Sequence, residues 1–190
     1  LIFNLALLLA ASSTFAQTPL IDRELFFGDP EISGAQLSPD GRFMAFVKPY
    51  KGTRNVWVKK TEEPFNAAKP VTDDLKRPVT SYFWSRDGKF ILFSQDKGGD
   101  ENYNVYAVNP AAPPAAGREV PAARNLTDLQ GIRAFIYSVP KSDPDAIFVG
   151  LNDRDNSWHD LYKVKISTGA RTLIRRNDDQ VSAWLFDQKD

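Results

Sequence analysis

The chain contains one phrase twice, and this repetition constrains its fold more than any other feature. LSPDGRFMAFV at 37–47 returns as WSRDGKFILFS at 84–94. Each copy is followed by a second matched phrase, NVWV at 55–58 and NVYAV at 104–108. Self-similarity with a period of roughly 40–50 residues is typical of propellers, which are built from four-stranded blades. A blade is a scaffold, so the chemistry of such a protein can lie outside the repeats.

The repeated phrases alternate their apolar side chains as β-strands do. Phe43, Ala45 and Val47 fall on one face of the first strand, and Met44 and Phe46 fall on the other. A strand that is apolar on both faces must be covered on both sides. Neighbouring blades cover the inner strands of a propeller in this way, so the alternation supports the same architecture.

An Asp-Gly turn leads into each of these strands. The aspartate side chain can accept hydrogen bonds from the backbone that follows it, and glycine takes the positive-φ position. We therefore interpret Asp40 and Asp87 as turn residues and not as acid–base groups.

Two further units extend the pattern. AIFVGL at 146–151 and DLYKVKI at 160–166 form a degraded third copy, and VSAWLF at 181–186 begins a fourth. A Pro/Ala-rich loop at 110–123 lengthens the second unit. Propellers close with about four to eight blades. We therefore expect the chain to be part of a longer protein.

The predicted fold class is all-β, a partial β-propeller of three four-stranded blades and the start of a fourth. The blades are expected at about 37–75, 80–129 and 132–175, with the next beginning at 181–190, and their fourth strands at 70–74, 125–129 and 171–175.

The N-terminal residues indicate export. LIFNLALLLAASSTFA at 1–16 resembles the apolar core and cleavage site of a secretory signal peptide. Its apolar core is too short to span a bilayer of about 30 Å, although a membrane anchor is the alternative. Residues 17–36 are expected to form an arm or a short helix that Asp22 caps and Gly28 ends. The predicted localisation is secreted or periplasmic, without a stable membrane span.

Composition excludes several classes of function. Lys+Arg and Asp+Glu are each 24, so no net field exists to recruit nucleic acid. The chain has no cysteine and one histidine, which excludes a structural zinc site, a thiol nucleophile and an iron–sulfur cluster. We expect no metal and no cofactor.

No catalytic residue is predicted within the chain. A serine hydrolase needs its nucleophile on a G-x-S-x-G elbow, and no such elbow occurs in the sequence. His159 is expected to be a hydrogen-bonded loop residue. Asp153, Asp155 and Ser157 alternate as calcium ligands do, but the Gly and Glu positions of an EF-hand loop are missing, so we interpret them as a hairpin loop.

The phrase KGGDENYN at 97–104 supplies the weak candidates for substrate binding. Asp100 and Glu101 could face a cavity and bind a peptide ammonium or an arginine. The alternative is a hairpin loop in which both acids pair locally. A second acidic pair, Glu62 and Glu63, is expected to be a solvated turn before a proline.

Three runs together resemble a known family. LFFGDPEISGAQLSPDGRFMAFV, SQDKGGDENYNVYAVNP and VGLNDRDNSWHDLYKVKISTG are similar to the N-terminal propeller of prolyl oligopeptidase family serine peptidases. The similarity is to the bacterial acylaminoacyl-peptidase and dipeptidyl-peptidase-like branch, and it covers about 25–190. The SPDG phrase occurs in many propellers, whereas the GGDEN and HDLY phrases are more specific.

The resemblance implies a two-domain enzyme. A propeller of seven or eight blades would cover a C-terminal α/β-hydrolase domain that carries a Ser-Asp-His triad, so that oligopeptides reach the serine and folded proteins do not. No position in 1–190 matches the motifs of the triad. The implied partners are the chain's own hydrolase domain and an oligopeptide substrate. The alternative is a non-enzymatic periplasmic propeller of the Tol-system type that binds proteins or carbohydrate.

Overall fold

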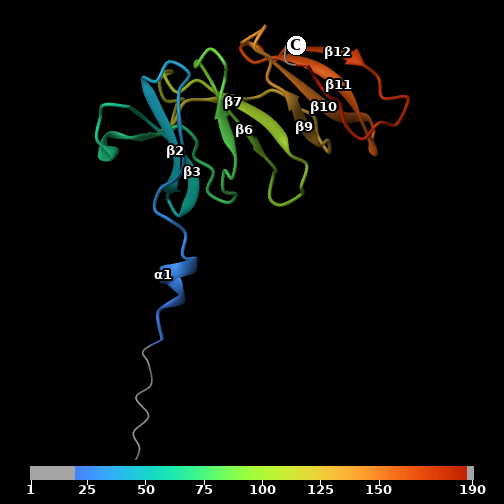
Figure 1. Ribbon diagram of the computed structural model, residues 1–190. Coiled ribbons are helices and arrows are strands. Elements are labelled where there is room, and N and C mark those ends of the chain that lie inside the picture. The colour runs from blue at the N-terminus through green and yellow to red at the C-terminus, as the bar shows by residue number, and fades with distance from the viewer. Residues whose placement is uncertain (1–19, 188–190) are drawn as a thin grey trace, which may run out of the picture. The chain divides into compact units, whose positions relative to one another are not determined.

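The computed structural model describes residues 20–187 (Figure 1). The chain divides into two compact units, Leu1–Pro30 and Glu31–Asp190. The expected signal peptide at 1–16 lies outside the described residues and stays a prediction.

In the first unit the described residues contain one short helix, α1 (Arg23–Phe27). The Asp22 side chain accepts a hydrogen bond from the Glu24 amide at 2.9 Å, which satisfies one free N–H of the first turn. The helix ends at Gly28. Both ends were predicted from the sequence, and both are confirmed.

The second unit contains three four-stranded antiparallel sheets, and the strands of each sheet pair in chain order. The first comprises β1 (Ser33–Leu37), β2 (Phe43–Tyr50), β3 (Thr53–Lys60) and β4 (Lys69–Pro70), with a 3₁₀ turn at Phe65–Ala67. The second comprises β5 (Tyr82–Trp84), β6 (Ile91–Gln95), β7 (Asn104–Val108) and β8 (Ala123–Asn125). The third comprises β9 (Ala134–Ser138), β10 (Ala146–Asp155), β11 (Trp158–Lys165) and β12 (Arg171–Arg175). This arrangement confirms the predicted all-β partial propeller.

The first blade begins earlier than the sequence predicted. Its first strand starts at Ser33, inside the stretch expected to be an arm, and not at Leu37. SGAQL is a mostly exposed edge strand without alternating apolar residues, so periodicity could not identify it. Residues 181–187 form no strand, and the fourth blade stays a prediction.

The repeated turns are built as expected. Asp40 accepts a hydrogen bond from the Ser38 hydroxyl at 2.6 Å, and Asp87 accepts one from the Ser85 hydroxyl at 2.7 Å. Gly41 adopts a φ of 70°, in the left-handed region that favours glycine. Both aspartates are therefore occupied by turn chemistry.

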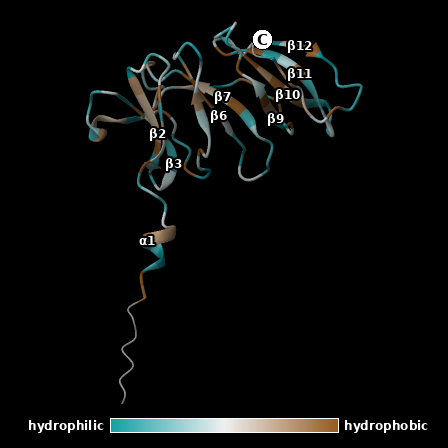
Figure 2. Ribbon diagram, viewed as in Figure 1, coloured by the Kyte–Doolittle hydropathy of each residue, from teal (hydrophilic) through white to brown (hydrophobic). Residues whose placement is uncertain are grey.

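Two apolar clusters join the three sheets, and the apolar residues concentrate in the strands (Figure 2). One cluster lies between the first and second sheets and includes Val47, Val56, Trp84, Ile91 and Phe93. The other lies between the second and third sheets and includes Leu92, Val105, Ile147, Val149 and Leu151. Each sheet thus packs face to face on the next, as blades do.

Two of the three fourth strands lie earlier in the chain than predicted. β4 ends at Pro70 and β8 ends at Asn125, where the expected strands were 70–74 and 125–129. The third, β12, lies at 171–175 as predicted.

A buried Asn–Thr pair explains both early ends. The Thr127 hydroxyl accepts a hydrogen bond from the Val105 amide at 3.0 Å and donates one to the Asn104 amide oxygen at 3.0 Å. Thr72 and Asn55 repeat this pattern in the first sheet. The threonine hydroxyl thus replaces the next backbone carbonyl as the acceptor between the third and fourth strands, and the backbone is free to leave the sheet. We call this arrangement the Asn–Thr clamp.

The clamp is expected to contribute measurably to stability. Replacing Thr127 with valine keeps the shape of the side chain but leaves the buried Val105 amide without an acceptor. An unsatisfied buried donor costs about 1–3 kcal/mol. Thr172→Val, at an exposed position of β12, is the control and should change stability by less than about 0.5 kcal/mol. Equal unfolding free energies of the two variants in a urea titration would contradict the clamp.

Candidate functional site

The loop between β6 and β7 is anchored by a buried aspartate. The Asp96 side chain is 2% exposed and accepts a hydrogen bond from the Arg77 Nε at 2.9 Å. It also accepts a long contact from the Glu101 amide at 3.4 Å. Burial alone would raise the pKa of Asp96, but the bonds from Arg77 and the loop backbone outweigh it and lower that pKa.

The two predicted binding residues lie on this loop, but their roles differ. Asp100 is exposed, and its Oδ1 accepts hydrogen bonds from the Lys97 amide at 3.2 Å and the Asn102 amide at 3.1 Å. Asp100 also lines a pocket of about 400 Å³. Glu101 has a φ of 58° and lies outside that pocket lining. The structure therefore presents Asp100 to a cavity and does not bring the two acids together there.

A second pocket, of about 530 Å³, lies where the first and second blades meet. Its floor is the stacked pair of Phe93 and Tyr106, whose ring centroids are 5.3 Å apart. Its lining includes the loop that leaves β4 after only two strand residues. Residues 71–77 and 118–123 form much of its wall.

Several charged side chains in the wall of this pocket form ion pairs with one another. Asp96 pairs with Arg77, and Asp73 pairs with Arg118, whose Nε lies 3.0 Å from Oδ2. Asp74 instead accepts hydrogen bonds from the backbone amides of residues 76 and 77 at 2.7 Å. These contacts hold the 71–77 loop against the second blade and give the pocket a fixed shape.

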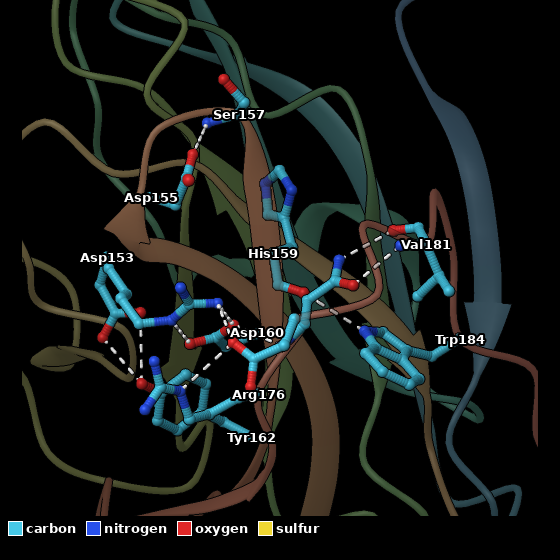
Figure 3. A network of polar contacts seen from close by, with 12 residues as sticks. Asp153, Asp155, Ser157, His159, Asp160, Tyr162, Arg176, Val181 and Trp184 are labelled. Carbon is cyan, nitrogen blue, oxygen red and sulfur yellow. Dashed lines mark hydrogen bonds and ion pairs between the residues drawn. The ribbon is translucent and has the colours of Figure 1, made fainter.

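His159 lies in β11 and not in a loop, contrary to the sequence prediction (Figure 3). Its ring packs on Phe135 with centroids 4.8 Å apart, and its backbone carbonyl accepts a hydrogen bond from the Trp184 indole at 3.3 Å. Burial lowers the pKa of the imidazole. Its Nε2 is buried without a hydrogen-bond partner in the described residues. The His159 ring is therefore packed as a structural side chain on the sheet.

The hairpin between β10 and β11 is held by its own side chains (Figure 3). Asp155 accepts a hydrogen bond from the Ser157 amide at 2.8 Å, and Asp153 accepts one from the Tyr162 hydroxyl at 2.9 Å. Burial and the Asp153 contact raise the pKa of Tyr162 to about 12. In residues 20–187 no group of three or more acidic or histidine side chains is placed to hold a metal ion.

Sequence reasoning missed the residues that line the pocket of about 530 Å³ between the first and second blades. Asp96 directly precedes the KGG run, at the start of the loop, but its partner Arg77 lies in a stretch without periodicity. Arg118 lies in the Pro/Ala-rich insertion, which the sequence explained only as added length. Contacts between loops of different blades leave no pattern in a single sequence.

Two curated proteins are similar to the chain along most of its length. Dipeptidyl aminopeptidase BIII of Pseudoxanthomonas mexicana is 38% identical over 178 residues, which are 94% of this chain and 24% of that protein. Dipeptidyl peptidase family member 6 of Caenorhabditis elegans is 29% identical over 169 residues, 88% of this chain and 22% of that protein. The chain thus spans about a quarter of the length of these relatives.

A solved prolyl endopeptidase structure shares the fold, with a TM-score of 0.54 at 13% identity over 76% of this chain and 22% of that one. No protein-family model matches the chain. The three stacked sheets define a β-propeller segment. The 38% identity with a dipeptidyl aminopeptidase supports the resemblance stated above, and the solved structure shows the same propeller fold.

The described part of the chain contains no helix that is long and apolar enough to cross a membrane.

The Arg77–Asp96 pair predicts a pH-dependent stability. Because the pKa of Asp96 is lowered on folding, its contribution is present above the unfolded value of about 3.9 and is lost as the pH falls through the folded value. Asp96→Asn should therefore lower the unfolding free energy at pH 7 by more than the ~0.5 kcal/mol of an ordinary surface change, and the difference should shrink below pH ~4.

Urea titrations of the wild type and Asp96→Asn at pH 7 and pH 3 measure the difference in their unfolding free energies. Asp128→Asn is the matched control, because Asp128 is exposed and, among the described residues, its carboxylate accepts one long hydrogen bond, from Asn125 at 3.4 Å. A difference between Asp96→Asn and wild type that is the same at both pH values would show that the ion pair is not its source.

Proposed function

We propose that this chain is the substrate-gating propeller portion of an exported serine peptidase that hydrolyses oligopeptides. The observation that carries the proposal is the 38% identity, across 94% of the chain, with a dipeptidyl aminopeptidase. The three blades supply a scaffold, and the G-x-S-x-G elbow is absent from their sequence. The nucleophile and its α/β-hydrolase domain would therefore belong to residues outside 1–190.

The architecture supports a gating role physically. Blades packed through two buried apolar clusters form a rigid wall that does not yield to a folded substrate. An extended oligopeptide is narrow enough to pass such a wall, whereas a folded domain is not. The wall thus selects by size before an acyl-enzyme can form on the downstream serine. The apolar start at 1–16 supports export to a secreted or periplasmic location.

Asp100 and Glu101 are proposed to hold the amino terminus of the substrate. Asp100 lines a pocket of about 400 Å³ together with Asp128, and the structure shows no ion pair for either acid in the described residues. A peptide ammonium offers three donors and a positive charge to such a group. Glu101 is exposed beside it and would act from the rim of the loop.

The activity is tested on the complete polypeptide that carries this sequence. It should release p-nitroaniline from dipeptidyl p-nitroanilides, react with a serine-directed fluorophosphonate and leave a folded protein with the same cleavage sequence intact. Residues 17–190 alone should be inactive and form the control. If the complete polypeptide has no G-x-S-x-G elbow and is not labelled by the fluorophosphonate, a non-enzymatic binding propeller is favoured. If it cleaves the folded protein as fast as the short substrates, gating is excluded.

The role of the acidic loop is tested by charge removal. Asp100→Asn keeps the amide-accepting oxygen of the turn but loses the charge, so the KM for a free-amine dipeptidyl substrate should rise about tenfold while kcat stays unchanged. Glu101→Gln should raise KM in the same direction. N-acetylated substrates should be unaffected. Glu62→Gln, at an exposed acid in the turn after β3, is the control, and unchanged KM in both loop variants would leave Asp100 as a turn residue.

A further inference from the structure

The connection from β7 to β8, residues 109–122, belongs to the second blade but is attached to the first. It is the Pro/Ala-rich insertion of the repeat, and its first half is exposed or half-buried. Its second half forms a compact turn, in which the Ala115 amide donates to the Val120 carbonyl at 2.9 Å and the Arg118 amide donates to the Ala115 carbonyl at 2.9 Å. This turn presents two consecutive charged residues to the neighbouring blade.

The first attachment is a forked ion pair. The Arg118 Nε lies 3.0 Å from Asp73 Oδ2, and its Nη2 contacts the other carboxylate oxygen of the same residue. Asp73 lies in the loop that leaves β4, so this pair joins the outer edges of the two blades. Two parallel contacts fix the direction of the guanidinium as well as its distance.

The second attachment reaches the turn between β2 and β3. Glu119 accepts a hydrogen bond from the Tyr50 hydroxyl at 2.6 Å and lies 3.3 Å from the Lys51 ammonium. The bond from Tyr50, followed by the Lys51 contact, lowers the pKa of Glu119. The two attachments lie on adjacent residues of one segment and bind separate parts of the first blade.

The attached segment also forms one wall of the pocket of about 530 Å³. Val120, directly after Glu119, is 1% exposed, and together with Arg118 and Pro121 it lines the pocket of about 530 Å³. The stacked Phe93 and Tyr106 form the floor on the other side. If the segment moved away, the pocket would lose the wall that Arg118, Val120 and Pro121 form, and its aromatic floor would become more accessible to solvent.

We propose that residues 109–122 form a strap that closes the pocket between the first two blades and is fastened by the Arg118–Asp73 and Glu119–Tyr50/Lys51 contacts. Each exposed ion pair shifts an opening equilibrium by less than about fivefold. The strap therefore opens at much lower cost than the strands, whose amides are protected by ladder bonds and packing. The strap is a local device that can uncover an aromatic pocket without unfolding either blade.

Hydrogen–deuterium exchange on the complete polypeptide tests the strap. In Arg118→Gln/Glu119→Gln, the peptide covering 112–121 should exchange about 3- to 30-fold faster, the range given by losing two surface contacts. The peptide covering β7, 104–108, should exchange at the wild-type rate. Arg124→Gln, which removes an exposed arginine of β8 that makes no ion pair in the described residues, is the matched control.

Salt provides a second measurement that requires no variant. Raising NaCl from 0.05 to 0.5 M screens exposed charges, so it should accelerate exchange of the wild-type strap and leave β7 unchanged. An apolar dye should also fluoresce more strongly in the double variant, because the floor of the pocket is uncovered. Unchanged strap exchange, an equal rise in β7, or faster exchange without added dye fluorescence would overturn the proposal.

Discussion

The structure depends on strands that are apolar on both faces. In β6, Ile91 and Phe93 enter the cluster shared with the first sheet, while Leu92 between them enters the cluster shared with the third. Because side chains alternate along a strand, neither face can be exposed without uncovering a buried residue. One strand of five residues thus dictates that its sheet has a neighbour on each side, which is the condition for stacked blades.

The two outer sheets meet the same requirement by different means. On the outer face of the first sheet, the buried Phe46 packs against Phe65 with ring centroids 5.4 Å apart. The Lys59 ammonium lies 5.1 Å from the centroid of the Phe65 ring and donates to the carbonyls of residues 60, 61 and 63 at 2.7–3.0 Å. This cap satisfies a buried charge with backbone acceptors. On the third sheet, Phe186 packs on Phe148 with ring centroids 4.8 Å apart. The segment expected to begin a fourth blade therefore already covers its predecessor.

Sequence periodicity predicted the parts of the fold that repeat. The central strands, the Asp-Gly turns and the helix ends at Asp22 and Gly28 follow from local rules that act within a few residues. The exposed first strand at 33–37 and the early ends of β4 and β8 do not, because they depend on burial and on a side chain replacing a ladder bond. Of the candidate site, the sequence predicted only the loop between β6 and β7. Asp100 stands out by composition, whereas Asp96 acquires its environment from Arg77, 19 residues away and in the preceding loop.

The Asn–Thr clamp connects the fold to the pocket and the strap. Where the clamp is present, the fourth strand has two or three residues, and the chain leaves the sheet directly after it. In the third blade Asp160 stands where Asn55 and Asn104 stand in the first two, and it pairs with Arg154 at 2.8 Å. There the fourth strand runs for five residues. The length of the outer strand thus varies with the side chain at this position. In the first blade, the loop after the short strand and the proposed strap line the same pocket.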